Sequence, residues 1–204
     1  MAADGWFGAQ DGALPTARTD GPGSAAELRL RQLQHGAPAA DVLAWLDQLP
    51  PVGVGELLGR WRGSELPTGH PLDGLLSAHC WYGKEFRDPE TAHPLLFPDG
   101  AGTPHPLDPT LAPLWLLRRA PGLLRTAPAR RAFALVRPLL RTARPQARLR
   151  LIEHRGVLTG ALVYDRLPVI DVFRRVSTDT LLGLMDMRGL PAPFPFVLRR
   201  DRSR

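Results

Sequence analysis

The sequence predicts an α+β protein in which N-terminal helices precede an antiparallel, barrel-like β-sheet with an arginine-rich helical insertion. Apolar residues recur at helical spacing before residue 58, whereas apolar and polar residues alternate with a period of two after residue 147. Hydrophobic residues make up 44% of the 204 residues, which supplies a core and excludes a wholly disordered chain. No run approaches ~20 consecutive apolar residues, which excludes a membrane-spanning helix. We therefore expect a single domain over residues 25–201.

The N-terminal part is predicted to contain a flexible leader followed by helices. Residues 1–24 are mostly Gly, Ala, Pro, Asp and Thr, which are too polar and too small to build a core. They also lack the basic and apolar regions of a signal peptide, so a cytoplasmic protein is expected. Residues 25–58 are expected to be helical, with Ser24 as a candidate N-cap. The expected helices cover residues 24–36, 39–49 and 54–59.

Residues 59–113 are predicted to mix short strands with irregular chain. Alternating residues indicate strands over 60–66 and 80–86, and one or two helical turns are expected over 72–78. Prolines are dense over residues 93–113. We therefore expect this last stretch to be irregular although packed.

Residues 114–145 are predicted to form the arginine-rich helical insertion. Helical patterns cover residues 114–124 and 129–144, and Pro138 is expected to kink the second helix. Four arginines of that helix follow spacings of seven, four and three, which places them on one face. They are Arg130, Arg137, Arg141 and Arg144.

Residues 146–201 are predicted to form an antiparallel meander, because five alternating segments are joined by short turns. With the two earlier strands, a curled sheet or small barrel is the expected closure. The five expected strands cover residues 147–154, 157–164, 168–176, 180–187 and 194–200.

The middle of the chain carries a Gly-x-Trp-x-Gly motif at residues 59–63 (GRWRG). It continues through residues 64–76 (SELPTGHPLDGLL), 81–84 (WYGK) and 93–97 (HPLLF). Together these segments resemble the bacterial family named for the motif, the GXWXG proteins. A strand that opens with Gly-x-Trp is also similar to those of lipocalin-like and nitrobindin-like barrels. By that analogy, the resemblance implies a barrel that holds a small apolar ligand or haem.

The second half of the chain resembles the domain of unknown function DUF4334, which usually follows the GXWXG segment. The matching residues run over 164–171 (YDRLPVID) and 173–176 (FRRV), then include Asp186, Gly189, Phe196 and residues 198–201 (LRRD). The resemblance covers roughly half of the chain and implies a family without implying a reaction.

Aromatic residues on the predicted strands are candidate walls of a ligand cavity. For Trp61 two interpretations are open, because a tryptophan between two glycines can also plug one end of a barrel. The candidate walls are Trp61, Trp81, Tyr82, Tyr164, Phe173 and Phe196.

Charged residues on strands whose two faces are both largely apolar are candidate catalytic groups. Asp171 and Asp186 each lie in such a strand, and an acid inside an apolar barrel would have a raised pKa that suits proton transfer. A structural Asp–Arg pair is the alternative. Lys84, Arg174 or Glu65 would stabilise developing charge. Lys84 is the only lysine beside 25 arginines, although a solvated strand lysine is the alternative for it.

Metal and cofactor sites are not predicted. The spacings of the five candidate ligands match no zinc pattern, and the sequence holds no Walker loop, dinucleotide fingerprint, nucleophile elbow or HExxH. Haem ligation through a lone histidine such as His154 is not specified by any neighbouring motif. The five candidates are His70, His79, Cys80, His93 and His105.

The basic charge is concentrated in one part of the chain. The net charge is +6, yet residues 118–155 alone hold 11 arginines and one acid, which leaves −4 for the remainder. An arginine face can contact an anionic membrane, a phosphorylated ligand or nucleic acid, or it can be a solvated outer face. Phe133 is the only aromatic residue there, which argues against nucleic acid as a partner.

Two hypotheses of function follow. The first is the binding of a small, largely apolar metabolite in a barrel cavity. The alternative is a cofactor-free isomerase or cyclase that uses carboxylate acid–base chemistry on a hydrophobic, natural-product-like substrate in the same cavity. A third class is a membrane- or partner-docking module that works through the four helix arginines. The oligomeric state is left open.

Overall fold

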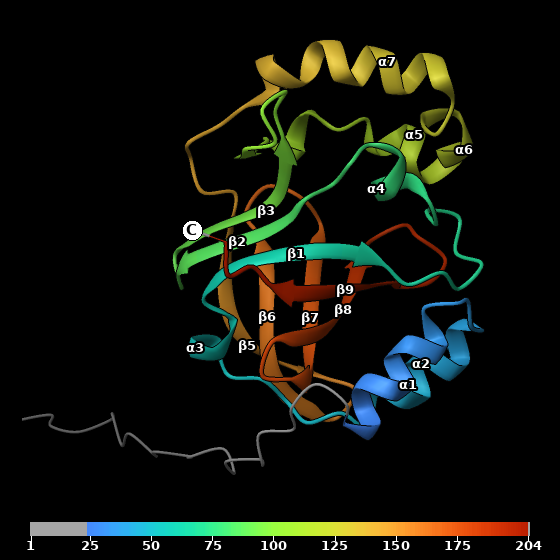
Figure 1. Ribbon diagram of the computed structural model, residues 1–204, viewed down its shortest axis with the longest axis vertical. Helices are drawn as coiled ribbons and strands as arrows, with labels where there is room; N and C mark the ends of the chain where they lie inside the picture. The colour runs from blue at the N-terminus through green and yellow to red at the C-terminus, as the bar shows by residue number, and fades with distance from the viewer. Residues whose placement is uncertain (1–23, 204) are drawn as a thin grey trace, which may run out of the picture.

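Eight antiparallel strands close into a barrel in the computed structural model, which describes residues 24–203 (Figure 1). The strand order is β2-β1-β9-β8-β7-β6-β5-β3, and pairing of β2 with β3 completes the ring, so that no barrel strand is left with a free edge. A short ninth strand, β4, pairs only with β3. The predicted leader lies outside the described residues except for Ser24. The strands are β1 Gly59–Glu65, β2 Gly83–Asp88, β3 Thr91–Pro98, β4 Pro104–Pro106, β5 Ala147–His154, β6 Val157–Tyr164, β7 Val169–Ser177, β8 Thr180–Met187 and β9 Phe194–Arg200.

The α+β fold class and the antiparallel barrel are therefore confirmed. The five C-terminal strands follow the period-two alternation, and consecutive strands pair as an antiparallel meander from β5 to β9. The turn between β5 and β6 consists of Arg155 and Gly156, both with positive φ (53° and 75°). Two consecutive positive φ values are the requirement of a type I′ hairpin turn, which matches the twist of the strands it joins.

The expectation of an irregular stretch over residues 93–113 is wrong for its first part, because β3 is a full barrel strand. It pairs with β2 on one side and contacts β5 on the other, and so closes the ring. Its prolines are tolerated because the pairing with β2 shifts register beside Pro94: Glu85 pairs with His93, whereas Gly83 pairs with Leu96. A bulge at this point needs no ladder hydrogen bond from the proline nitrogen.

The first two helices cover the outer face of the barrel. Helix α1 (Ala25–Leu33) begins after Ser24, whose Oγ accepts a hydrogen bond from the Glu27 amide at 3.3 Å, and α2 (Ala39–Leu46) follows it. Their buried apolar side chains form one cluster with outward-facing residues of β7, β8 and β9. These strands therefore carry largely apolar side chains on their outer faces as well as on their inner faces.

One end of the barrel is closed by helix α3 (Val54–Leu57). The indole N–H of Trp61 donates to the carbonyl of Leu57 at 2.7 Å, and the guanidinium of Arg200 lies 4.2 Å from the centre of the Trp61 ring. Trp61 is fully buried. It therefore ties β1 to the helix that plugs this end.

The arginine-rich insertion lies across the opposite end of the barrel (Figure 1). The expected helix over residues 129–144 is too long: α7 ends at Val136 and a 3₁₀ turn follows, because Pro138 lacks the N–H that an α-helix needs. Arg141 is extended, so the four arginines do not share one helix face. Within residues 24–203, no helix has the length and apolar character required to cross a bilayer. The elements at this end are α4 Leu75–Ala78, α5 Leu114–Arg119, α6 Pro121–Leu124, α7 Ala127–Val136, and the 3₁₀ turns η1 Pro109–Leu111 and η2 Arg137–Leu140.

Candidate functional site

A cavity of about 390 Å³ lies between the mouth of the barrel and the insertion. Its floor is formed by the ends of barrel strands and its roof by the insertion, and almost all of its lining side chains are apolar. Its volume falls within the ~300–1,000 Å³ range of small-molecule sites. Representative lining residues are Tyr164, Val169, Met185 and Phe194 from the barrel and Phe133 and Leu140 from the roof.

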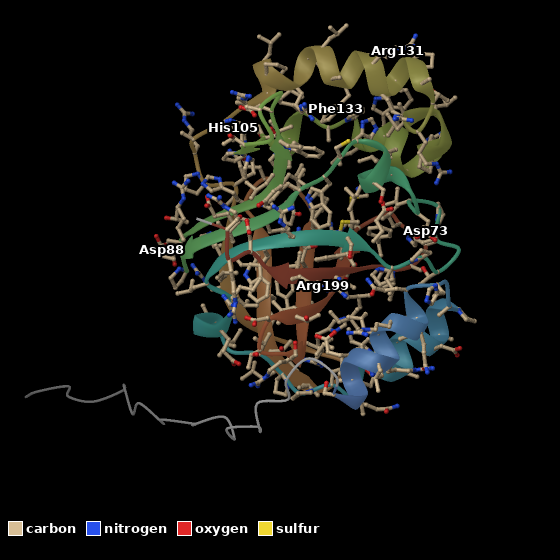
Figure 2. The ribbon with its side chains drawn as sticks, viewed as in Figure 1. Asp73, Asp88, His105, Arg131, Phe133 and Arg199 are labelled. Atoms are coloured by element: carbon tan, nitrogen blue, oxygen red, sulfur yellow. The ribbon has the colours of Figure 1, made fainter. Side chains whose placement is uncertain are left out.

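Helix α7 covers the cavity with its apolar strip. In Figure 2, Phe133 lies below α7 on the barrel side. The Phe133 ring packs edge-on against Phe97 of β3, with centroids 5.3 Å apart, and against His79, with centroids 4.8 Å apart. The insertion is therefore a lid over the barrel as well as a basic surface.

Lys84, Asp171 and Tyr164 meet in the barrel interior at the floor of this cavity. The Lys84 Nζ lies 2.8 Å from Asp171 Oδ2 and donates also to the Tyr164 hydroxyl at 3.3 Å and to the Pro94 carbonyl at 3.1 Å. Lys84 and Asp171 are 3% and 0% exposed. Tyr164 is the one member of the three that lines the cavity. It therefore connects a buried ion pair to the space where a ligand would lie.

Burial dominates the acid–base properties of this cluster. It raises the pKa of Tyr164 well above 10, with the Asp171 carboxylate adding to the rise, so the phenol keeps its proton at neutral pH. Burial also raises the pKa of Asp171, and the contact with Lys84 opposes that rise. The Asp171 Oδ1 has no partner among the described residues, which leaves one acceptor atom unused in the interior.

The other three charged candidates lie away from the cavity. Asp186 is exposed on the outer face of β8. Glu65 accepts hydrogen bonds from the amides of Gly74 and Leu76 and thereby holds the start of α4. Arg174 is buried on the outward-facing side of β7, where it donates to the His154 carbonyl at 3.1 Å. The structure thus brings Lys84, Asp171 and Tyr164 together and separates Asp186, Glu65 and Arg174 from them.

Four of the aromatic candidates fill the barrel interior below the cavity. Trp61, Trp81, Phe173 and Phe196 are buried in one core cluster, where Phe196 packs edge-on against both Trp81 (5.9 Å between centroids) and Phe173 (6.1 Å). Tyr82 is half-buried outside this cluster, and its hydroxyl donates to the Asp201 carboxylate. Of the six candidate walls, Tyr164 is the one that lines the cavity.

The contribution of the lid to the site is not among the residues predicted from the sequence. Phe133, Val136 and Leu140 line the cavity together with Ala129, at spacings of four, three and four along α7 and η2. This spacing was the available signal, since it defines one helix face. The spacing identifies an apolar face of the helix but does not show that this face packs over the mouth of the barrel.

The histidines do not form a metal site in the described part of the chain. No group of three His, Cys, Asp or Glu side chains converges within residues 24–203. His70 contacts the Ala192 carbonyl at 3.1 Å, and His79 contacts the Leu124 carbonyl at 2.9 Å, so both rings have structural roles. His105 lies 2.9 Å from Asp99.

Comparison with known proteins decides the family. The GXWXG protein family matches residues 44–102, and the domain of unknown function DUF4334 matches residues 145–200. A crystal structure of a protein from Thermomonospora curvata is 31% identical, and the alignment covers 87% of this chain and 99% of that chain with a TM-score of 0.65. The chain belongs to the GXWXG/DUF4334 family. A comparison with curated proteins found no match.

The GXWXG and DUF4334 segments of the family build opposite parts of one barrel in this structure. Strands β1, β2 and β3 lie in the GXWXG segment, and β5 to β9 lie in the DUF4334 segment. Pairing of β1 with β9 and of β3 with β5 joins the two segments into one ring. The lid, between residues 102 and 145, lies outside both matches.

Asp201, which follows β9 and accepts hydrogen bonds from Tyr82 and Ser203, predicts a measurable pH effect. Burial opposes ionisation of this carboxyl, but hydrogen bonds from Ser203 and Tyr82 outweigh it and lower its pKa from 3.8 to about 2. The ionised form therefore stabilises the fold above pH 4, and this contribution is lost as the pH falls from about 4 to about 2. In urea unfolding at several pH values, we expect Asp201→Asn to reduce the acid-induced loss of unfolding free energy. Identical pH profiles for variant and wild type would contradict this assignment.

Proposed function

We propose that this GXWXG/DUF4334 protein binds a small, largely apolar molecule in the cavity under the lid. The observation that carries the proposal is the cavity itself: about 390 Å³, bounded by the barrel mouth and α7, with apolar side chains on nearly every side. Burial of an apolar ligand there removes its surface and that of the lining from water, which is the main source of affinity in such sites.

Filling the cavity with a larger side chain tests this proposal. Met185 lines the cavity from β8, and Met185→Trp places an indole in the space that a ligand would occupy. We expect at least about tenfold weaker binding of the neutral fluorescent probe N-phenyl-1-naphthylamine, equivalent to about 1.4 kcal/mol. Leu158→Trp is the matched control, because Leu158 is 50% exposed on β6 and lies outside the cavity lining.

We expect Met185→Trp to weaken binding of the probe and Leu158→Trp to leave it unchanged. Circular dichroism and urea unfolding first establish that Met185→Trp folds. A folded Met185→Trp that binds the probe as tightly as wild type and Leu158→Trp would overturn the proposal, since the probe would then occupy another site.

A second candidate, a cofactor-independent isomerase or cyclase, is favoured by one observation: the Tyr164 hydroxyl lies 3.3 Å from the Lys84 ammonium, and Tyr164 lines the cavity. In this candidate, Tyr164 donates its proton to the substrate and Lys84 stabilises the phenolate. The same oxygen then recovers a proton from another carbon, so that the reaction is an isomerisation with no net proton change. Asp171 balances the charge of Lys84 and lies behind the reacting groups.

Removal of the hydroxyl separates this enzyme from a binding protein. A panel of ten-carbon unsaturated aldehydes and alkenes is incubated with the protein in D₂O, and deuterium incorporation is followed by NMR. We expect Tyr164→Phe to lower the incorporation rate by about 10²–10⁴-fold while binding of N-phenyl-1-naphthylamine is retained. If wild type incorporates no deuterium into any member of the panel, or Tyr164→Phe does so equally fast, the catalytic candidate is rejected and the binding function stands.

A further inference from the structure

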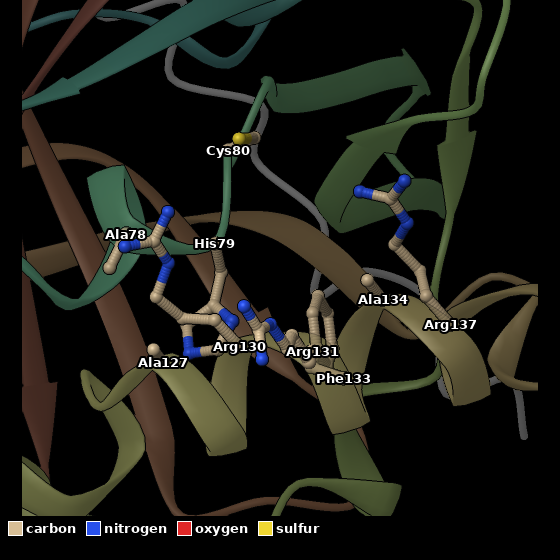
Figure 3. Close-up of a pocket in the computed structure, with 9 residues that line it drawn as sticks. All are labelled: Ala78, His79, Cys80, Ala127, Arg130, Arg131, Phe133, Ala134 and Arg137. Carbon is tan, nitrogen blue, oxygen red and sulfur yellow. The ribbon is translucent and has the colours of Figure 1, made fainter.

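A second pocket, of about 410 Å³, adjoins the apolar cavity. It lies between α7 and the segment that carries His79 and Cys80 (Figure 3). Two side chains, His79 and Phe133, line both this pocket and the apolar cavity. The two spaces are therefore neighbours that share one wall, the edge-on His79–Phe133 pair.

The chemistry of this second pocket is opposite to that of the first. Arg130, Arg131 and Arg137 all line it, and no carboxylate does. Arg130, Ala134 and Arg137 stand at spacings of four and three on α7 and its C-cap, next to the strip that carries Phe133. One strip of α7 thus lines the apolar cavity, and the adjacent strip lines the basic pocket.

The arginines of this pocket have no acidic partner among residues 24–203. Arg141, Arg148, Arg150 and Arg155 of the same basic segment each form an ion pair, and Arg118 donates to a backbone carbonyl. Arg130, Arg131 and Arg137 do neither in the described structure. Unpaired guanidinium groups around a concave surface are donors available to an anion, and guanidinium geometry matches carboxylate and phosphate oxygens.

His79, which lies in the wall shared by the two spaces, has a pKa that depends on the nearby Arg130 charge. His79 donates from Nε2 to the Leu124 carbonyl at 2.9 Å, which leaves its buried Nδ1 without a partner among the described residues. Burial lowers the pKa of His79, and the positive charge of Arg130 lowers it further. The neutral ring separates an apolar space from a basic one, and it keeps a hydrogen-bond acceptor at the boundary.

We propose that the pocket of Arg130, Arg131 and Arg137 holds the anionic head group, a carboxylate or a phosphate, of an amphiphilic ligand whose apolar body fills the adjoining cavity. This inference rests on the proposed binding function and specifies the ligand class for the same site. The lid then recognises both ends of one molecule: the strip of Phe133 contacts the apolar body, and the arginine strip contacts the head.

The test compares two probes with the same ten-carbon chain, decyl phosphate and decan-1-ol, each by displacement of N-phenyl-1-naphthylamine. We expect wild type to bind decyl phosphate at least tenfold more tightly than decan-1-ol, with a preference that falls as salt rises. Arg130→Gln/Arg137→Gln removes most of that preference and leaves decan-1-ol affinity unchanged. Arg119→Gln/Arg144→Gln is the matched control, because it removes the same charge from exposed positions outside the pocket.

Cys80 supplies a second readout, because this exposed thiol lines the pocket and is the only cysteine in the sequence. Decyl phosphate is expected to slow its alkylation by the neutral reagent N-ethylmaleimide at least tenfold, and decan-1-ol is expected to slow it less. An unchanged alkylation rate at saturating decyl phosphate would place the head group elsewhere and overturn the inference.

The outcomes separate this inference from the function on which it rests. Equal affinities for the two probes, or an equal loss of preference in the control variant, would overturn the anionic head group while leaving apolar binding intact. Displacement by neither probe would overturn the amphiphilic ligand class, whereas failure of N-phenyl-1-naphthylamine itself to bind would remove the binding function. Co-sedimentation with phosphatidylglycerol vesicles identifies the source: reduced binding of Arg130→Gln/Arg137→Gln, but not of the control, indicates a head group met in a lipid surface. If decyl phosphate displaces the dye but the protein does not bind the vesicles, the ligand is a free molecule in solution.

Discussion

Replacing Gly83 with alanine is expected to cost about 3 kcal/mol or more of unfolding free energy. A Cβ at this position would lie 1.9 Å from the carbonyl oxygen of Trp61, a backbone atom that cannot move aside alone. The residue also has a φ of +146°, which L side chains rarely adopt. Overpacking costs about 1–3 kcal/mol and backbone strain a further ~1–3 kcal/mol, a large part of the ~5–15 kcal/mol stability of a typical domain.

Gly63→Ala is expected to cost less than Gly83→Ala, although it too destabilises the barrel. A Cβ at Gly63 would lie 2.1 Å from the Trp81 ring, which is a side chain and can shift at some cost. Gly100→Ala is the matched control, since a Cβ there meets nothing within 4 Å. Urea unfolding of the three variants checks this order. Midpoints for Gly83→Ala or Gly63→Ala equal to that of Gly100→Ala would show that the close approach of β1 and β2 is not needed.

We expect the loss of either member of the Lys84–Asp171 pair to destabilise the protein by about 3–5 kcal/mol, because the remaining charge is left buried without its partner. The variants Asp171→Ala and Lys84→Met measure this cost in urea or by thermal unfolding. The double variant Lys84→Met/Asp171→Leu is expected to recover most of the loss, since it removes both charges and refills the interior with apolar atoms.

A surface pair serves as the control for this effect. Arg148 Nε lies 2.7 Å from Asp165 Oδ1, with side chains 48% and 29% exposed, so water screens the pair. Asp165→Ala is expected to cost at most about 1 kcal/mol. If Asp171→Ala costs no more than Asp165→Ala, the Lys84 charge left behind is not buried without compensation. That result would contradict the role given to the pair at the floor of the cavity.

The predicted positions of most elements followed from local features of the sequence. The period-two pattern after residue 147 specified β5 to β9, because a strand with a buried face repeats every second residue. The same period places Asp171 and Phe173 on one face of β7 and Arg174 and Val176 on the other. Lys84 was a candidate because it is the only lysine in the sequence, and in the structure it forms an ion pair with Asp171.

Long-range packing decided what local features could not. β3 looked irregular because its prolines weaken the strand signal, and only pairing with β2 and β5 makes it a barrel strand. Both faces of β7 are apolar because α1 and α2 cover the outer one, so no pattern along the strand shows that Asp171 points inward and Asp186 of β8 outward. The same limit applies to the insertion, because the spacing of its apolar residues indicates one helix face but not the barrel mouth that this face covers.

Residue type at short spacing was enough to indicate the family, the α+β class, the strand alternation and the glycines of the GXWXG motif. Only the folded chain shows that the insertion is a lid, that Tyr164 and Phe133 line the same cavity, and that a basic pocket adjoins that cavity. Those relations join residues that are far apart in the chain. They arise when the barrel closes, and the residue pattern of a single strand does not show which distant strands it will pair with.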